Sequence, residues 1–184
     1  MADPHPSDGP DAPEAMTAAE GAELMESASV QNAVAVAGPG ALLMVPVAKV
    51  LAANGMAHET QPKVWTLDLG KLVQTMLERK RWNQLKDAAA YDVNKSILVS
   101  TTDVRRSNSA AMYLALTSYA KNGDVVTDRA AADPLARQLA ELFKHQGYQE
   151  NYVNGNFDDY VAIGMGKAPM AFIYEYQLVS HALA

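Results

Sequence analysis

The sequence predicts an α/β fold, a layered sheet with flanking helices, from three observations. Short apolar runs at 96–100 and 170–174 are typical of buried strands. Stripes of apolar residues at helical spacing precede and separate these runs, so strands and helices alternate along the chain. The 184 residues are 49% apolar and 20% charged and include no cysteine, which fits one soluble globular domain and excludes a disulfide scaffold or a Cys-ligated zinc.

Residues 1–28 are expected to form a disordered, acidic, proline-rich tail. They hold seven acidic residues, four of the nine prolines and no Lys or Arg. The remaining residues 29–184, expected to form the α/β domain, are therefore close to neutral although the whole chain carries −6. That charge argues against nucleic acid as a partner, and the acidic N-terminus does not have the pattern of a signal peptide.

The first apolar segment, residues 33–51, predicts a buried strand or turn followed by a helix. Glycines and prolines at 38–40 and at Pro46 interrupt it, so it does not supply the unbroken apolar run that a membrane span needs. The helix is expected over residues 45–53 and ends at the turn signal 54–55.

A second helix is predicted up to Leu77, with Thr66 as its N-cap and Asp68 in its first turn. Leu69, Leu72, Val73, Met76 and Leu77 form its apolar stripe. The basic triplet 79–81 follows. The triplet could be an anion or nucleic-acid patch. We favour the interpretation that the three cations are stabilised by the negative end of the helix dipole.

A strand is predicted at 96–100 and a polar loop at 101–106. Residues 107–109 then precede a helix-forming stretch that starts at Ala110 and runs to the stop at 122–123. Strand, loop and helix together make half of a βαβ unit. Residues 124–128 are expected to form a short strand or turn. A further helix is predicted to open at Asp133 and Pro134 and to end at Gly147, with a buried stripe of Leu135, Leu139, Leu142 and Phe143.

The C-terminal part is expected to contain a short helix at 157–163, a tight turn at 164–169 and the strand 170–174. Asp158 and Asp159 could be paired catalytic acids, but capping of the short helix is the interpretation we favour. The Gly-rich turn lacks the glycine spacing and the Ser or Thr of a phosphate-binding loop.

The start of the helix after the 101–106 loop is the strongest candidate for a ligand site. In an open α/β sheet, ligands bind where strands end and helices begin, because the first N–H groups of a helix favour negative charge. Ser107, Asn108 and Ser109 would lie there, with Arg105 and Arg106 just before them. Such a site could hold an oxyanion or carboxylate. The competing interpretation is an ordinary N-cap beside solvated arginines.

Catalytic chemistry has little support in the sequence. The four histidines have no partner at metal-ligand spacing, and the Gly-x-Ser-x-Gly motif of serine hydrolases does not occur. We therefore expect a protein that is not an enzyme, with no catalytic residues, no metal and no cofactor.

Two stretches, NKSILVSTTDVRRSNSAAMYL at 94–114 and FDDYVAIGMGKAPM at 157–170, resemble bacterial extracellular solute-binding proteins. These proteins are similar to the substrate-binding subunits of ABC transporters and have the type 2 periplasmic-binding fold. Residues 65–68 and 173–175 fit the same pattern. The resemblance covers roughly residue 42 to the C-terminus and looks mainly like one lobe of that two-lobed fold.

The resemblance implies a solute held between two lobes, with Ser107, Asn108 and Ser109 in contact with it and Tyr174 as a further candidate. It also implies an extracytoplasmic location, and an ABC permease or a second lobe as partner. The expected function is non-catalytic binding of a small polar or anionic solute. The alternative is a protein-interaction or oligomerisation module built on such a lobe, because a half-protein exposes apolar surface that its missing lobe would cover.

Overall fold

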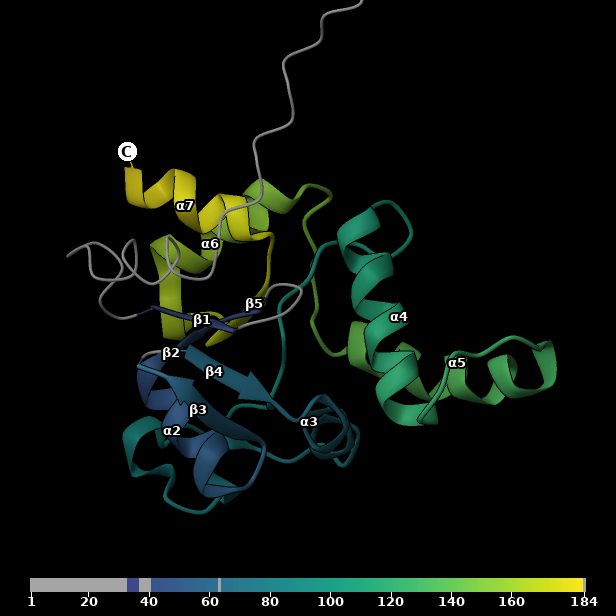
Figure 1. The fold of residues 1–184 in the computed structure, drawn as a ribbon, viewed down its shortest axis with the longest axis horizontal. Helices are drawn as coiled ribbons and strands as arrows, with labels where there is room; N and C mark the ends of the chain where they lie inside the picture. The colour runs from purple at the N-terminus through teal and green to yellow at the C-terminus, as the bar shows by residue number, and fades with distance from the viewer. Residues whose placement is uncertain (1–32, 37–40, 63, 184) are drawn as a thin grey trace, which may run out of the picture.

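A five-stranded sheet with helices packed around it forms the described part of the chain in this computed structural model (Figure 1). The structure describes residues 33–36, 41–62 and 64–183. The predicted tail 1–28 and the start of the domain predicted at 29–184 therefore lie outside the described residues. The mixed α/β class that the sequence predicts is confirmed.

The sheet has the strand order β3-β4-β1-β2-β5. Its strands are β1 (Ala33–Val36), β2 (Ala41–Met44), β3 (Ala57–Gln61), β4 (Val64–Leu67) and β5 (Met170–Phe172). β1 runs antiparallel to β2 and parallel to β4, while β5 joins the far edge antiparallel to β2. The last strand in the sequence is thus added at one edge of a sheet whose other four strands come from the N-terminal part of the chain.

The two predicted N-terminal helices are present as α2 (Val45–Ala53) and α3 (Leu69–Leu77). The predicted cap of α3 is wrong, because Thr66 belongs to β4. Asp68 is the N-cap, and its Oδ1 accepts a hydrogen bond of 2.9 Å from the backbone N–H of Lys71. A carboxylate at this position satisfies one of the free N–H groups of the first helical turn.

The predicted strand at 96–100 is an extended segment with only single bridges at its ends. Ser96 pairs with Arg81, and Ser100 pairs in parallel with Ala171 of β5. Ile97 and Val99 are buried, as the apolar run predicts. The expected parallel arrangement of a βαβ unit is therefore realised at Ser100 rather than along a full strand.

The remaining helices are α4 (Asn108–Asn122), α5 (Arg129–Lys144), α6 (Val153–Ile163) and α7 (Glu175–Leu183), with single 3₁₀ turns η1 (Trp82–Gln84), η2 (Ala88–Tyr91) and η3 (Gly164–Gly166). α4 ends at Gly123 as predicted. The predicted start of α5 is wrong, because Asp128 caps the helix by accepting from the N–H of Ala131, and Pro134 lies inside it. No strand forms at 124–128.

Helix α6 begins earlier than predicted, at Val153. Asp158 and Asp159 therefore lie inside the helix, and the prediction that they cap it is wrong. Asp159 instead forms an ion pair with Lys167, just beyond the turn η3.

No helix in the described part of the chain is long and apolar enough to cross a membrane.

β5 separates two hydrophobic clusters. Met170 and Phe172 belong to the main core together with buried residues of α2, α3, α4 and α5, whereas Ala171 and Ile173 pack with α6 and α7. Successive side chains of a strand point to opposite faces, so one short strand serves both clusters. In Figure 1, α6 and α7 lie near the β1–β5 side of the sheet, and α4 and α5 lie at the right of the view, next to α3.

The capping role of Asp68 predicts a measurable cost when its carboxylate is removed. We expect Asp68→Ala to lower the free energy of unfolding by about 1 kcal/mol, whereas Asp68→Asn, which keeps an acceptor oxygen, should lose only part of that. Urea unfolding followed by circular dichroism measures both. Equal losses for the two variants would contradict the capping role.

Candidate functional site

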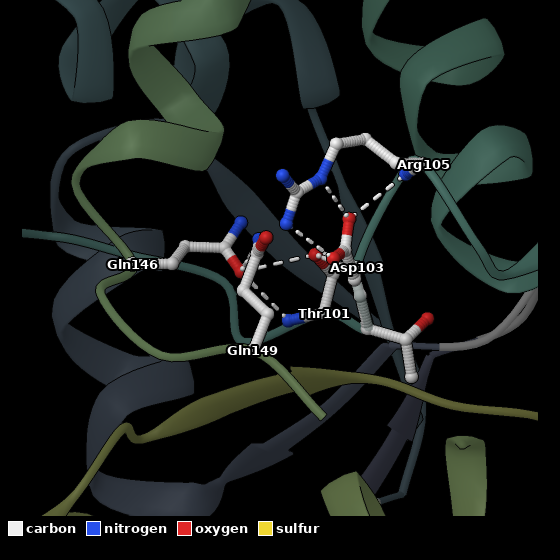
Figure 2. A network of polar contacts seen from close by, with 6 residues as sticks. Thr101, Asp103, Arg105, Gln146 and Gln149 are labelled. Atoms are coloured by element: carbon white, nitrogen blue, oxygen red, sulfur yellow. Dashed lines mark hydrogen bonds and ion pairs between the residues drawn. The ribbon is translucent and has the colours of Figure 1, made fainter. Parts of the chain in front are cut away.

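Two segments connect the sheet with the α4–α5 pair, and they lie side by side. Residues 101–107 lead from the sheet edge to α4, and residues 145–152 lead from α5 back to α6. The backbone N–H of Asp103 donates a 2.9 Å hydrogen bond to the carbonyl of Glu150. Figure 2 shows the polar side chains that gather where these two crossing segments meet.

Gln146 ties the two crossing segments together through a single oxygen. Its Oε1 accepts from the N–H of Thr101 at 2.9 Å, from Thr101 Oγ1 at 3.0 Å and from Gln149 Nε2 at 3.1 Å (Figure 2). Thr101 is buried, so its polar groups need these partners. The network fixes the start of the first segment against the second.

Asp103 holds Arg105 in a bidentate ion pair (Figure 2). Arg105 Nε donates to Oδ1 at 2.9 Å and Nη2 to Oδ2 at 2.6 Å, and the Arg105 N–H also donates to Oδ1. These hydrogen bonds from Arg105 lower the pKa of Asp103 from 3.8 to about 2. The carboxylate of Asp103 is buried while the guanidinium is exposed, so the charge of Arg105 is largely compensated locally.

The start of α4 lacks the cap that an ordinary serine N-cap would supply. Ser107 occupies the N-cap position, but its side chain makes no capping hydrogen bond. Its Oγ instead accepts from the buried Thr102 Oγ1 at 2.7 Å. Asn108 is exposed, and the buried Ser109 Oγ has no hydrogen-bond partner among the described residues. The first turn of α4 therefore keeps the free N–H groups that attract anions.

A cavity of about 370 Å³, here termed the crossing cavity, opens between the two segments. It is lined by Asp103, Arg105, Arg106, Gly147, Tyr148, Gln149 and Asn151. Both arginines predicted from the sequence face it, but Ser107, Asn108 and Ser109 are not among its lining residues. The structure therefore brings together the arginines and the second segment, with the predicted Ser-Asn-Ser group beside them in the chain.

Comparisons with protein-family models, with curated proteins and with solved structures find no match for this chain.

Tyr174, the remaining predicted contact, follows β5. Its ring stacks on Tyr176 with the ring centres 6.0 Å apart, and its N–H donates to Gln177 Oε1. Because β5 and Ser100 pair in parallel, Tyr174 and the 101–107 segment leave the sheet at the same edge. Tyr174 does not line the crossing cavity.

The sequence analysis does not identify several residues of the site. For Asp103 a signal exists, because its i, i+2 spacing to Arg105 in a polar loop suits a local carboxylate–guanidinium pair. Gln146, Tyr148, Gln149 and Asn151 lie some 45 positions away in an unremarkable stretch, and only the fold brings them to the site. Among the described residues, no group of three or more His, Asp or Glu is placed to hold a metal ion.

The lowered pKa of Asp103 predicts an acid-dependent contribution to stability. A carboxylate whose pKa falls from 3.8 to about 2 on folding stabilises the fold above the higher value, and that stabilisation disappears as the pH drops toward the lower one. We expect Asp103→Asn to lower the thermal midpoint at pH 6, and the difference from wild type to shrink between pH ~4 and pH ~2.

Thermal melts from acid to neutral pH test this, with Asp92→Asn as the control, because Asp92 is an exposed carboxylate outside the site. A difference between Asp103→Asn and wild type that does not change with pH would show that the ion pair with Arg105 is not the cause.

Proposed function

We propose that the chain binds a small polar or anionic solute without chemical conversion, as the substrate-binding component of a transporter that delivers the solute to a permease. The observation that carries this proposal is the crossing cavity, a polar hollow at the junction of two chain segments, with Arg105 and Arg106 on its wall. The resemblance of residues 94–114 and 157–170 to solute-binding proteins supports the same function.

The charges around the crossing cavity favour a solute that carries one negative charge or several hydrogen-bonding oxygens. Asp103 compensates Arg105, and no described carboxylate forms an ion pair with Arg106. An anion bound by Arg106 would gain a charge-assisted hydrogen bond. Gln149 and Asn151 add amide groups, and Tyr148, 77% exposed, offers a ring face for the body of the solute.

The first turn of α4 supplies a second source of positive potential. Arg106 immediately precedes the N-cap Ser107, whose hydroxyl accepts from Thr102 instead of capping the helix. Free N–H groups and the helix dipole favour negative charge within the first turn.

A binding screen tests the proposal. Thermal-shift measurements with amino acids, sugars and small oxyanions should identify one class that stabilises the protein, and calorimetry should then give its affinity. Arg106→Gln should weaken that affinity about tenfold, the usual worth of one charge-assisted hydrogen bond. Arg137→Gln is the matched control, because Arg137 is an exposed charge on α5 that does not line the cavity.

No stabilisation of the folded wild-type protein by any of the three solute classes would contradict the proposal. Unchanged affinity in Arg106→Gln would remove the crossing cavity as its site.

A protein-interaction or oligomerisation module is the second candidate, favoured by two exposed tyrosines. Tyr148 and Tyr152 are 77% and 79% exposed on the second crossing segment, and tyrosine is enriched at protein interfaces. Light scattering after size exclusion distinguishes the two functions. A monomer that binds a solute supports the first, whereas an oligomer that dissociates in Tyr148→Ser or Tyr152→Ser supports the second.

A further inference from the structure

A second cavity of about 200 Å³ lies on a different part of the molecule, here termed the α3–α5 cavity. Its walls come from the C-terminal end of α3, the extended segment 96–99, the middle of α4 and the C-terminal end of α5. It shares no lining residue with the crossing cavity. The solute proposed above does not account for it.

Part of the lining of the α3–α5 cavity is basic. Arg79, Arg81 and His145 line it, and none of its lining residues is Asp or Glu. Arg79 Nη2 reaches Glu141 Oε2 at 3.1 Å. Arg81 Nη1 donates to the backbone oxygen and to Oδ1 of Asn94, at 2.9 and 3.1 Å. Because both of these oxygens are neutral, they leave the charge of Arg81 uncompensated.

Another part of the lining is apolar and belongs to the main core. Ile97, Val99 and Leu142 line it and are at most 5% exposed, and Met76 lies beside them. Such a wall binds hydrocarbon and gives nothing to a bare inorganic anion. The cavity thus combines an apolar wall with a cationic rim.

Tyr113 adds an unused hydrogen-bonding group. It lines the cavity, its side chain is 2% exposed, and its hydroxyl has no hydrogen-bond partner among the described residues. Burial raises the pKa of Tyr113, so the hydroxyl stays protonated and can donate. A buried hydroxyl without a partner is unfavourable, and a ligand oxygen in the cavity would supply one.

Arg79 stands in a backbone conformation that arginine rarely adopts. Its φ is +58°, in the left-handed region, directly after the last residues of α3. Glycine is the usual residue for this position at a helix end. This strained residue is one of the lining residues of the cavity, and strained residues of this kind cluster at ligand sites.

We propose that the α3–α5 cavity is a separate ligand site for a small carboxylate with an apolar body, such as an aromatic or branched-chain carboxylate. The carboxylate pairs with Arg79 and Arg81 and accepts a hydrogen bond from Tyr113, and the body packs against Ile97 and Leu142. The size is suitable, because an apolar cavity of about 150 Å³ holds one benzene ring.

Calorimetry with benzoate, its neutral isostere benzamide, and sulfate tests the proposal on the full chain. Benzoate should bind, and both benzamide and sulfate should bind at least about tenfold more weakly, because one lacks the charge and the other the apolar body. Arg81→Gln should lower the affinity for benzoate about tenfold, with Arg137→Gln unchanged.

Tyr113→Phe is the most discriminating variant. It removes only the unpartnered hydroxyl and keeps the ring contacts with Phe143 and Phe172. The thermal midpoint of the unliganded protein should therefore stay the same or rise, while the affinity for benzoate falls at least about threefold. A variant that binds benzoate like wild type would show that the hydroxyl does not contact the carboxylate.

Three results would overturn the proposal. The first is no heat with benzoate at millimolar concentration from a folded sample. The second is binding of sulfate as tight as binding of benzoate, which would indicate a simple anion patch. The third is loss of benzoate binding in Arg106→Gln but not in Arg81→Gln, which would place benzoate in the crossing cavity.

Discussion

The buried amide of Asn156 holds together the parts on which both cavities depend. Its Nδ2 donates to the carbonyl of Phe172 at 3.2 Å and to that of Ser100 at 3.4 Å, and its Oδ1 accepts from Ser100 Oγ at 2.6 Å. The extended segment 96–100 is bridged to β5 only at Ser100, and this amide from α6 adds side-chain hydrogen bonds at the same residue. Burying an amide is favourable only when its hydrogen bonds are made, and here both ends of the amide have partners. The segment held in this way fixes where the chain leaves the sheet toward α4.

Gln146 connects the two cavities, which share no lining residue. It lines the α3–α5 cavity, and its Oε1 accepts from Thr101 and from Gln149, of which Gln149 lines the crossing cavity. Three donors converge on this one oxygen, so displacement of Gln146 leaves the backbone N–H of the buried Thr101 without its acceptor. A ligand that moved Gln146 in one cavity would therefore change the free energy of the crossing segments at the other. Coupling of this kind is reciprocal for binding free energies.

The sequence predicts where the helices lie better than it predicts the residues at which they start. It also identifies the arginines of the crossing cavity better than it predicts the residues they contact. The apolar stripes of α3 and α5 repeat over two or more turns, so packing preserves them. Several possible capping residues lie near each helix start, and the structure uses Asp68 and Asp128 where the sequence favours Thr66 and Asp133. Arg105 is recognisable from the sequence, but its pairing with Asp103 depends on a backbone turn. The second wall of the crossing cavity comes from residues 147–151, which carry no motif.

The residue at the positive-φ position after α3 differs in kind from those after the other helices. After α2, α4, α5 and α6 the left-handed or positive-φ position is taken by Gly55, Gly123, Gly147 and Gly164, because glycine has no Cβ to clash there. After α3 the same kind of position is taken by Arg79. A non-glycine residue in this region costs of order 1 kcal/mol or more. The exposed ion pair between Arg79 and Glu141 offsets little of this cost, because surface ion pairs contribute little to stability. Glycine takes this position at the four other helix ends, whereas after α3 the position carries Arg79, one of the lining residues of the α3–α5 cavity.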